Sequence, residues 1–173
     1  MKLNYKIRIL LLVTVFITSF SNAQSPAIEW QKSLGGTNIE YGRSIIQTTD
    51  GGFVIAGQSQ SNNGDVTGNH GSDDCWIVKL SSIGAIEWQK SLGGSSFDWS
   101  SDIIQTTDGG YIIAGNTQSN NGNVTGNHGY IDYWIVKLSS LGIIEWQRCL
   151  GGTGDDRATS IIPTTDGGYV VAG

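Results

Sequence analysis

The sequence predicts an all-β fold built from repeated four-stranded antiparallel blades of a β-propeller. Three observations support this fold class. A 58-residue unit repeats along the chain, each unit has four short apolar stretches separated by glycine-rich turns, and no segment has helical periodicity. About two and a half units are present, so the predicted propeller is incomplete. A β-solenoid is the alternative, although solenoid coils are usually shorter and lack a four-strand hairpin unit.

The repeat is defined by one nine-residue segment. Ile28–Gly36 recurs identically as Ile86–Gly94, and again as Ile144–Gly152 with Arg148 and Cys149 as the only changes. The first two units align without a gap and differ at 18 of 58 positions. We therefore predict a partial β-propeller repeat region over residues 24–173. Its units are residues 28–85, residues 86–143 and the truncated unit 144–173.

Each unit is expected to contain four strands. Ile86–Leu92 alternates apolar and polar residues, which is typical of a half-buried strand. Asp108-Gly109-Gly110 lies between two apolar runs and predicts a hairpin turn. The strands predicted for the second unit are residues 86–92, 102–107, 111–115 and 133–138.

The third unit stops at Gly173, inside a predicted strand. Because propellers usually have four to eight blades, we expect the chain to be a fragment of a longer protein. The alternative is self-assembly, in which several chains together complete a ring.

Residues 1–23 are predicted to be a cleaved signal peptide. Lys2, Lys6 and Arg8 precede an apolar run over residues 9–20, and the small-residue pattern Ser21-Asn22-Ala23 follows. This run is shorter than the roughly 20 residues that a membrane-spanning helix needs. We expect a secreted or cell-surface protein that is not an integral membrane protein.

The charge composition excludes one class of partner. The chain has 15 acidic and 10 basic residues, a net charge of −5, and only 14% charged residues, against about 25% in typical globular chains. Nucleic-acid-binding domains are usually basic, so no nucleic-acid partner is expected.

Acidic residues are the main candidates for catalysis. Glycosidases need two carboxylates about 5 to 10 Å apart, and the third unit offers Asp155 and Asp156. A catalytic pair is needed once per site, whereas most acidic positions here recur in every unit, which favours a structural role. Asp155 is the exception, since it replaces Ile39 and Phe97. We assign no catalytic residue. The recurrent acidic sets are Glu40, Asp98 and Asp156; Asp50, Asp108 and Asp166; and Glu29, Glu87 and Glu145.

No metal site or cofactor is predicted, although calcium is an open alternative in one loop. Asn63, Asp65, Thr67 and Asn69 place oxygen atoms at alternating positions, as a Ca²⁺ site would. The second unit has no carboxylate in this loop, which favours an asparagine-rich loop held by its own hydrogen bonds.

The histidines and cysteines also lack a site pattern. His70 and His128 occupy equivalent Gly-Asn-His-Gly segments without another histidine or cysteine at ligand spacing. Cys75 and Cys149 stand at non-equivalent repeat positions, so buried thiols are favoured over a disulfide.

Binding residues are predicted where the units differ most. All eight positions of Thr37–Ser44 differ from those of Ser95–Asp102. Tyr41, Trp99 and Arg157 occupy one equivalent position in the three units, and we predict these three as binding residues. Variable segments on a constant scaffold often carry binding surfaces, and aromatic rings suit the apolar faces of sugars. The alternative is that these side chains only cover the end of a strand.

The repeat resembles a known family on four motifs. They are Thr106–Gly115, Gly126–Gly129, Trp134–Leu138, and Trp146-Gln147 followed by Leu150–Gly152. These motifs resemble those of secreted β-propeller-like repeat proteins of Bacteroidota, which often end in a sorting domain for type IX secretion. No such domain is present here, and some relatives carry an endoglucanase-like label.

These observations lead to one functional hypothesis. We expect a non-catalytic secreted or cell-surface protein with a binding or scaffolding role, and a glycan or surface protein as its ligand. A secreted polysaccharide hydrolase, endoglucanase-like, is the alternative.

Overall fold

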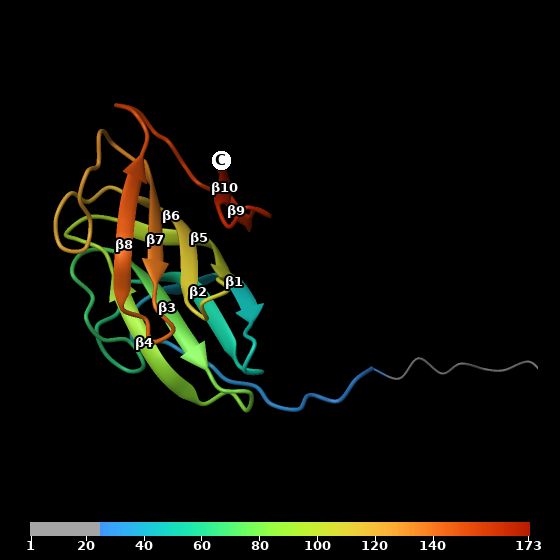
Figure 1. The fold of residues 1–173 in the computed structure, drawn as a ribbon. Coiled ribbons are helices and arrows are strands. Elements are labelled where there is room, and N and C mark those ends of the chain that lie inside the picture. The colour runs from blue at the N-terminus through green and yellow to red at the C-terminus, as the bar shows by residue number, and fades with distance from the viewer. Residues whose placement is uncertain (1–24) are drawn as a thin grey trace, which may run out of the picture.

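The computed structural model describes residues 25–173, which form ten strands and no helix (Figure 1). The predicted signal peptide, residues 1–23, lies outside the described residues. The all-β fold class is confirmed for the described part of the chain, where no helix is long and apolar enough to cross a membrane. The strands are β1 (Glu40–Gln47), β2 (Phe53–Ser59), β3 (Asp74–Leu80), β4 (Ile86–Leu92), β5 (Asp98–Gln105), β6 (Tyr111–Thr117), β7 (Asp132–Leu138), β8 (Ile144–Leu150), β9 (Ser160–Pro163) and β10 (Tyr169–Ala172).

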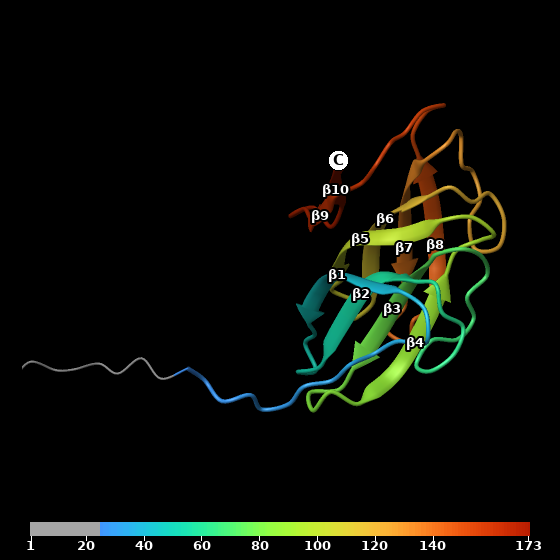
Figure 2. The ribbon, with the colours of Figure 1, turned by 180° about the vertical axis from the view of Figure 1, so that it is seen from behind.

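The strands form three antiparallel sheets. Two sheets have four strands each, in the orders β1-β2-β3-β4 and β5-β6-β7-β8, and β9 pairs with β10 in a third sheet. Neighbours in each sheet are consecutive in sequence, because short turns join adjacent antiparallel strands. Within residues 25–173 the three sheets lie side by side without closing into a ring (Figures 1 and 2).

The prediction that the four strands of one repeat form one blade is wrong by one strand. The second sheet runs from β5 to β8 and so combines three strands of one repeat with the first strand of the next. The reason is the tight turn at residues 139–142, where the Gly142 N–H donates to the Ser139 carbonyl at 3.0 Å. This turn makes β8 the antiparallel neighbour of β7, whereas Gly93 and Gly94 lead the chain from β4 into another sheet.

The second predicted strand is also longer than expected. β5 begins at Asp98 instead of Asp102, because an irregular register between Ser100 and Asp102 lets its first residues continue to pair with β6. The equivalent irregularity occurs in β1, between Gly42 and Ser44. The segments that differ most between units therefore lie largely on strands.

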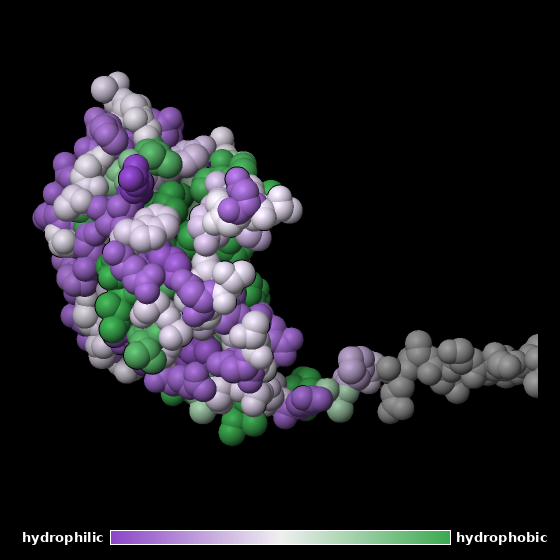
Figure 3. Space-filling model, viewed as in Figure 1, coloured by the Kyte–Doolittle hydropathy of each residue, from purple (hydrophilic) through white to green (hydrophobic). Residues whose placement is uncertain are grey.

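The inner strands β1, β5 and β9 are neighbours on one side of the molecule, while β4 and β8 lie on the opposite side (Figures 1 and 2). Asp102 on β5 joins all three, because its carboxylate accepts hydrogen bonds from Ser44 Oγ at 2.9 Å and the Ile161 N–H at 3.1 Å. The space-filling view shows that this side is hollowed (Figure 3). Ile45 and Ile162 are 61% and 56% exposed.

The main core lies between the two four-stranded sheets. Trp134 and Val136 of the second sheet pack in one buried cluster with Val54 and Ile77 of the first. Trp134 is fully buried, and its indole N–H donates to Gln147 Oε1 at 2.9 Å, which satisfies its polar atom. Cys75 and Cys149 also belong to this cluster as free thiols, and burial raises the pKa of Cys149 to about 12.

A buried lysine ties the outer strand of the first sheet to a hairpin turn. Lys79 on β3 is 3% exposed, and its ammonium lies 2.9 Å from Asp50 and 3.0 Å from Glu87. Hydrogen bonds from Thr48, from the Gly52 N–H and from Lys79 hold the pKa of Asp50 well below its usual range. Lys137 makes the equivalent pairs in the second sheet, so this network is part of the repeat scaffold.

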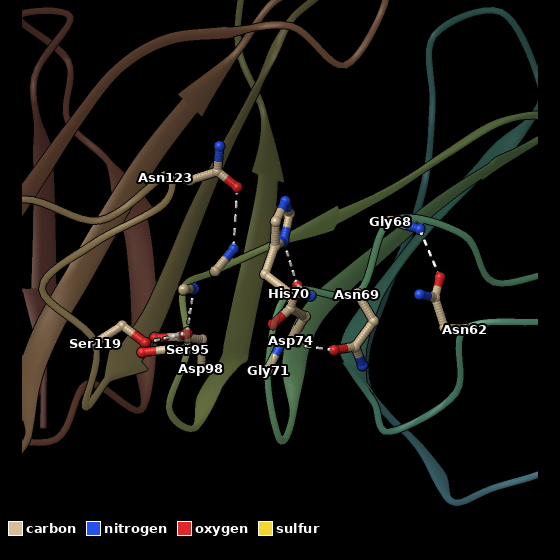
Figure 4. Close-up of polar contacts among 12 residues, drawn as sticks. Asn62, Gly68, Asn69, His70, Gly71, Asp74, Ser95, Asp98, Ser119 and Asn123 are labelled. Atoms are coloured by element: carbon tan, nitrogen blue, oxygen red, sulfur yellow. Dashed lines mark hydrogen bonds and ion pairs between the residues drawn. The ribbon is translucent and has the colours of Figure 1, made fainter.

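The asparagine-rich loops are held by their own side chains. Asn62 Oδ1 accepts the Gly68 N–H and Asn69 Oδ1 accepts the Gly71 N–H, both at 2.9 Å (Figure 4). Asn63 and Asp65, two members of the calcium alternative, accept N–H groups of residues 37 and 35. Across residues 25–173, no three histidine, cysteine, aspartate or glutamate side chains gather as a metal site would require.

Candidate binding site

A pocket of about 360 Å³ opens at the junction of the first two sheets. This volume falls within the range of small-ligand sites. Its floor is polar and buried, its wall is aromatic, and two arginines stand at its rim. The lining residues are Arg43, Gln58, Asp73, Phe97, Trp99, Gln118 and Arg157.

The backbone fixes this junction. Asp73 precedes β3 and forms a parallel bridge with Phe97, which precedes β5. The Asp98 N–H also donates to the Asp73 carbonyl at 2.7 Å. The floor and the aromatic wall therefore belong to different sheets but are held against each other by main-chain bonds.

Asp98 anchors the aromatic wall from behind. Its fully buried carboxylate accepts the Gly94 N–H and Ser119 Oγ, both at 2.7 Å, as well as Thr117 Oγ1 (Figure 4). Burial raises the pKa of Asp98, and these hydrogen bonds oppose that shift. Because successive side chains of a strand point to opposite faces, the inward anchoring of Asp98 turns Phe97 and Trp99 toward the pocket.

The floor is a short polar relay. Arg43 donates from Nε and Nη2 to Gln58 Oε1 at 3.3 and 3.1 Å. Gln58 in turn donates from Nε2 to Asp73 Oδ2 at 2.9 Å. Asp73 Oδ1 is buried and has no hydrogen-bond partner within the described residues. A neutral amide thus separates the guanidinium from the carboxylate.

The aromatic wall consists of Trp99, whose ring is covered by Arg157, and Phe97, whose ring is exposed. The Arg157 guanidinium lies over Trp99, with its Cζ 5.8 Å from the ring centroid, and Arg157 Nη2 is 3.1 Å from Asp155 Oδ2. Trp99 therefore holds Arg157 in place. Phe97 is 44% exposed and offers its ring to a ligand.

The structure brings together two of the three predicted binding residues. Trp99 and Arg157 line the same pocket although they belong to different repeats. Tyr41 instead lines a separate hollow of about 210 Å³, together with Lys32, Leu34 and Trp76 among others. Arg43 lies over the Tyr41 ring, with its Cζ 5.4 Å from the centroid, and so stands between the two sites.

Five lining residues were missed by the sequence prediction, namely Arg43, Gln58, Asp73, Phe97 and Gln118. A signal for the first four is present in the repeat alignment. Six of the seven lining residues occupy positions that differ between the first two units, and Gln118 is the exception. The counterparts of Arg43, Gln58, Asp73 and Phe97 are Ser101, Asn116, Ile131 and Ile39.

The next junction has the same backbone but different side chains. Ile131 and Asp155 form the equivalent parallel bridge between the second sheet and the third repeat. Asn116 replaces Gln58 there, and its side chain accepts the Ala158 N–H at 2.7 Å instead of joining an arginine. The relay of the candidate site is therefore particular to the first junction of the described chain.

The remaining sequence candidates lie outside the pocket lining. Asp156 accepts the Gly152 N–H at 2.7 Å, in the same way as Asp98 accepts Gly94. His70 Nδ1 lies 2.6 Å from the buried Asp74 carboxylate (Figure 4). The His70 contact connects a loop to the start of β3, whereas Asp156 lies ahead of β9 in a segment that forms no strand.

In comparisons with known proteins, no protein-family model matches the chain, and no curated protein matches it.

Proposed function

We propose that this chain is a non-catalytic, secreted or cell-surface repeat protein that binds a glycan in the pocket between its first two sheets. One observation carries the proposal. The lining residues are drawn almost entirely from the positions that break the repeat, while the scaffold positions around them are repeated. Drift alone would scatter such differences over the surface, whereas a binding site would gather them.

The chemistry of the lining favours a sugar. Phe97 offers an exposed aromatic ring for the apolar face of a pyranose. Gln58, Gln118 and Asp73 supply amide and carboxylate groups suited to hydroxyls. Asp73 Oδ1 is a buried acceptor without a hydrogen-bond partner in the described residues. Buried acceptors usually bond to a donor group, a water molecule or a ligand.

The architecture supports the wider proposal. The four-stranded sheets lie side by side, with β1 and β5 on the inner side and β4 and β8 on the outer side (Figure 1), and this supports an interpretation as propeller blades. We infer that each sheet is one blade of a larger ring, completed by further repeats or by other copies. Together with the signal-peptide pattern, the resemblance to secreted Bacteroidota repeat proteins supports delivery to the cell surface, where a glycan or a surface protein would be met.

A polysaccharide hydrolase is less well supported. It would need two carboxylates flanking the bond to be cleaved, and the lining of this pocket contributes one, the buried Asp73. Asp155 is 46% exposed and is paired with Arg157 outside the lining.

The test is binding of a panel of neutral and acidic oligosaccharides, followed by isothermal titration calorimetry. We expect at least one panel member to bind and Phe97→Ala to weaken it about tenfold or more, as loss of a ring–sugar contact worth about 1.4 kcal/mol would. Tyr130→Ala is the matched control, because Tyr130 is 64% exposed and lies outside the pocket. Equal effects of the two substitutions would overturn the site. Release of reducing ends, abolished by Asp155→Asn, would favour the hydrolase.

A further inference from the structure

We infer that the glycan bound in this pocket carries an anionic group, a carboxylate or a sulfate, that Arg43 and Arg157 recognise. The inference rests on the proposed function and specifies its ligand class. Residues 25–173 contain three arginines, Arg43, Arg148 and Arg157, and two of them line this one pocket.

This concentration contrasts with the charge of the chain. The protein has a net charge of −5, yet the pocket lining has two guanidinium groups and one carboxylate. Guanidinium groups thus outnumber carboxylates in the lining itself, while Asp155 pairs with Arg157 just outside it. Such a lining favours an acidic ligand over a cation.

Neither guanidinium forms a bidentate salt bridge with a carboxylate of the described residues. Arg43 donates both of its hydrogen bonds to the neutral amide of Gln58. This amide lies between Arg43 and Asp73, so the two charged groups are not in direct contact. Arg157 makes one contact at 3.1 Å with Asp155, whose side chain is 46% exposed. An exposed pair of this kind is weak, so a ligand anion can compete for Arg157.

The repeat alignment shows that this pair of charges is specific to the site. Arg43 corresponds to Ser101 in the second unit and Thr159 in the third, and Arg157 corresponds to Tyr41 and Trp99. Two different repeat positions thus each hold arginine once, and the fold brings the two into one pocket. A scaffold role would call for the same residue in each unit, as it does for Lys79 and Lys137.

The geometry of the wall supports recognition of a planar anion. Trp99 lies against Arg157 and restricts it, which lowers the entropy lost when the guanidinium binds. Arginine forks bind carboxylates and other oxyanions through two parallel N–H donors. The exposed ring of Phe97 lies in the same lining, where it suits the sugar ring that carries the anion.

The experiment compares three probes by calorimetry with the full chain. They are hexagalacturonate, its neutral methyl ester and a sulfated galactan hexasaccharide. We expect one of the acidic probes to bind at least about tenfold more tightly than the methyl ester, and to weaken as salt is raised. Preference for the uronate assigns a carboxylate, and preference for the sulfated sugar assigns a sulfate.

The variants separate this inference from the proposed function. Arg43→Gln and Arg157→Gln should each weaken the acidic probe about tenfold, with the neutral ester unaffected. Arg148→Gln is the matched control, because Arg148 lies on β8 outside the pocket. Equal affinity for acidic and neutral sugars would overturn the anionic ligand and leave glycan binding standing. Failure of these probes and of the neutral panel to bind would overturn both.

Discussion

Ile28–Leu34 and Ile86–Leu92 have identical sequences, but they adopt different structures. The second segment is β4, the outer strand of the first sheet, and its Leu92 is buried. The first segment forms no strand, and Ile28 is 78% exposed. Because the local sequence is the same, the cause must lie in what surrounds each segment.

The two segments dock in the same way on the sheet that follows them. Trp30 contacts Phe53 edge to face at 5.8 Å, and Trp88 contacts Tyr111 in the same way at 5.9 Å. Each tryptophan also lies over the glycine of the following turn, where φ is positive and an added Cβ would meet the indole at about 3 Å. That glycine is Gly84 for Trp30 and Gly142 for Trp88.

The Gly-Gly segments that follow are tied by equivalent hydrogen bonds as well. The Gly35 N–H donates to Asp65 at 3.1 Å, and the Gly93 N–H donates to Asn123 at 3.2 Å. The placement of residues 28–36 relative to the first sheet thus repeats that of residues 86–94 relative to the second.

The difference is the neighbouring strand. β4 pairs with β3, where Trp76 donates its indole N–H to Gln89 at 2.9 Å and Lys79 binds Glu87. Within residues 25–173 no strand pairs with residues 28–34. The comparison teaches that this sequence is competent to form a strand but becomes one only beside a partner strand. An edge strand such as β4 pairs on one side only, so without that one partner none of its main-chain groups is paired in a sheet.

The largest expected effect is on amide hydrogen exchange. The amides of residues 86–92 that bond to β3 should exchange about 100-fold or more slowly than their counterparts in residues 28–34, because sheet amides require an opening event. Identical sequences have nearly identical intrinsic exchange rates, so the ratio reports structure directly. Mass spectrometry of the two peptides checks this, and equal protection would contradict the comparison.

The next effect is on stability when the tryptophans are removed. Trp88 packs against the main core cluster, whereas Trp30 is 40% exposed. Trp88→Ala should lower the free energy of unfolding by about 2–3 kcal/mol, below the range for a fully buried tryptophan, and Trp30→Ala by less than about 1 kcal/mol. Urea denaturation measures both, and similar losses would mean that residues 28–34 are as well packed as β4.

A smaller effect is expected from the glutamates. Glu87 lies 3.0 Å from the buried Lys79 ammonium, and its equivalent Glu29 makes no ion pair in the described structure. Glu87→Gln should cost about 0.5–1 kcal/mol, since the Glu87 side chain is itself 45% exposed, and Glu29→Gln should cost nothing measurable. Thermal unfolding of the two variants at low salt provides the measurement. A loss for Glu29→Gln would reveal a partner for residues 28–34.

The smallest expected effect is on the stability of the fold at acidic pH. The pKa of Asp50 is lowered by Thr48, the Gly52 N–H and Lys79, so its ionised form stabilises the fold above its unfolded pKa near 4. This contribution is lost as the pH falls through the lower folded pKa. The stability difference between wild type and Asp50→Asn should thus be full at pH 6 and shrink below pH 4.

Asp166 provides the control for that measurement. Its pKa is also lowered, by Thr164 and the Gly168 N–H, but no lysine contributes. Asp166→Asn should give a smaller difference that responds less to salt. Urea denaturation from pH 2 to pH 6 measures both variants. Equal salt responses would show that Lys79 does not contribute to the effect of Asp50.

The candidate site was predictable only in part. Trp99 and Arg157 stand in the segment where the units differ most, and the alignment alone selects them. Gln58 and Asp73 each lie in a pair of adjacent substitutions elsewhere in the unit, and their approach to Phe97 depends on the bridge between two sheets. Tyr41 has the same repeat position as Trp99 but lines another hollow, formed by residues 32 and 34 and by the first sheet, because within residues 25–173 no sheet precedes β1.

The sequence by itself determined the all-β class, the 58-residue repeat, the hairpin turns and most strand positions. These features depend on alternation and on glycine at turns, which are local properties. Tertiary structure alone decided which four strands share a sheet, which of two identical segments becomes a strand, and which variable residues meet in one pocket. Each of these depends on hydrogen bonds and packing between residues far apart in the chain, and such partners leave no mark on the local pattern.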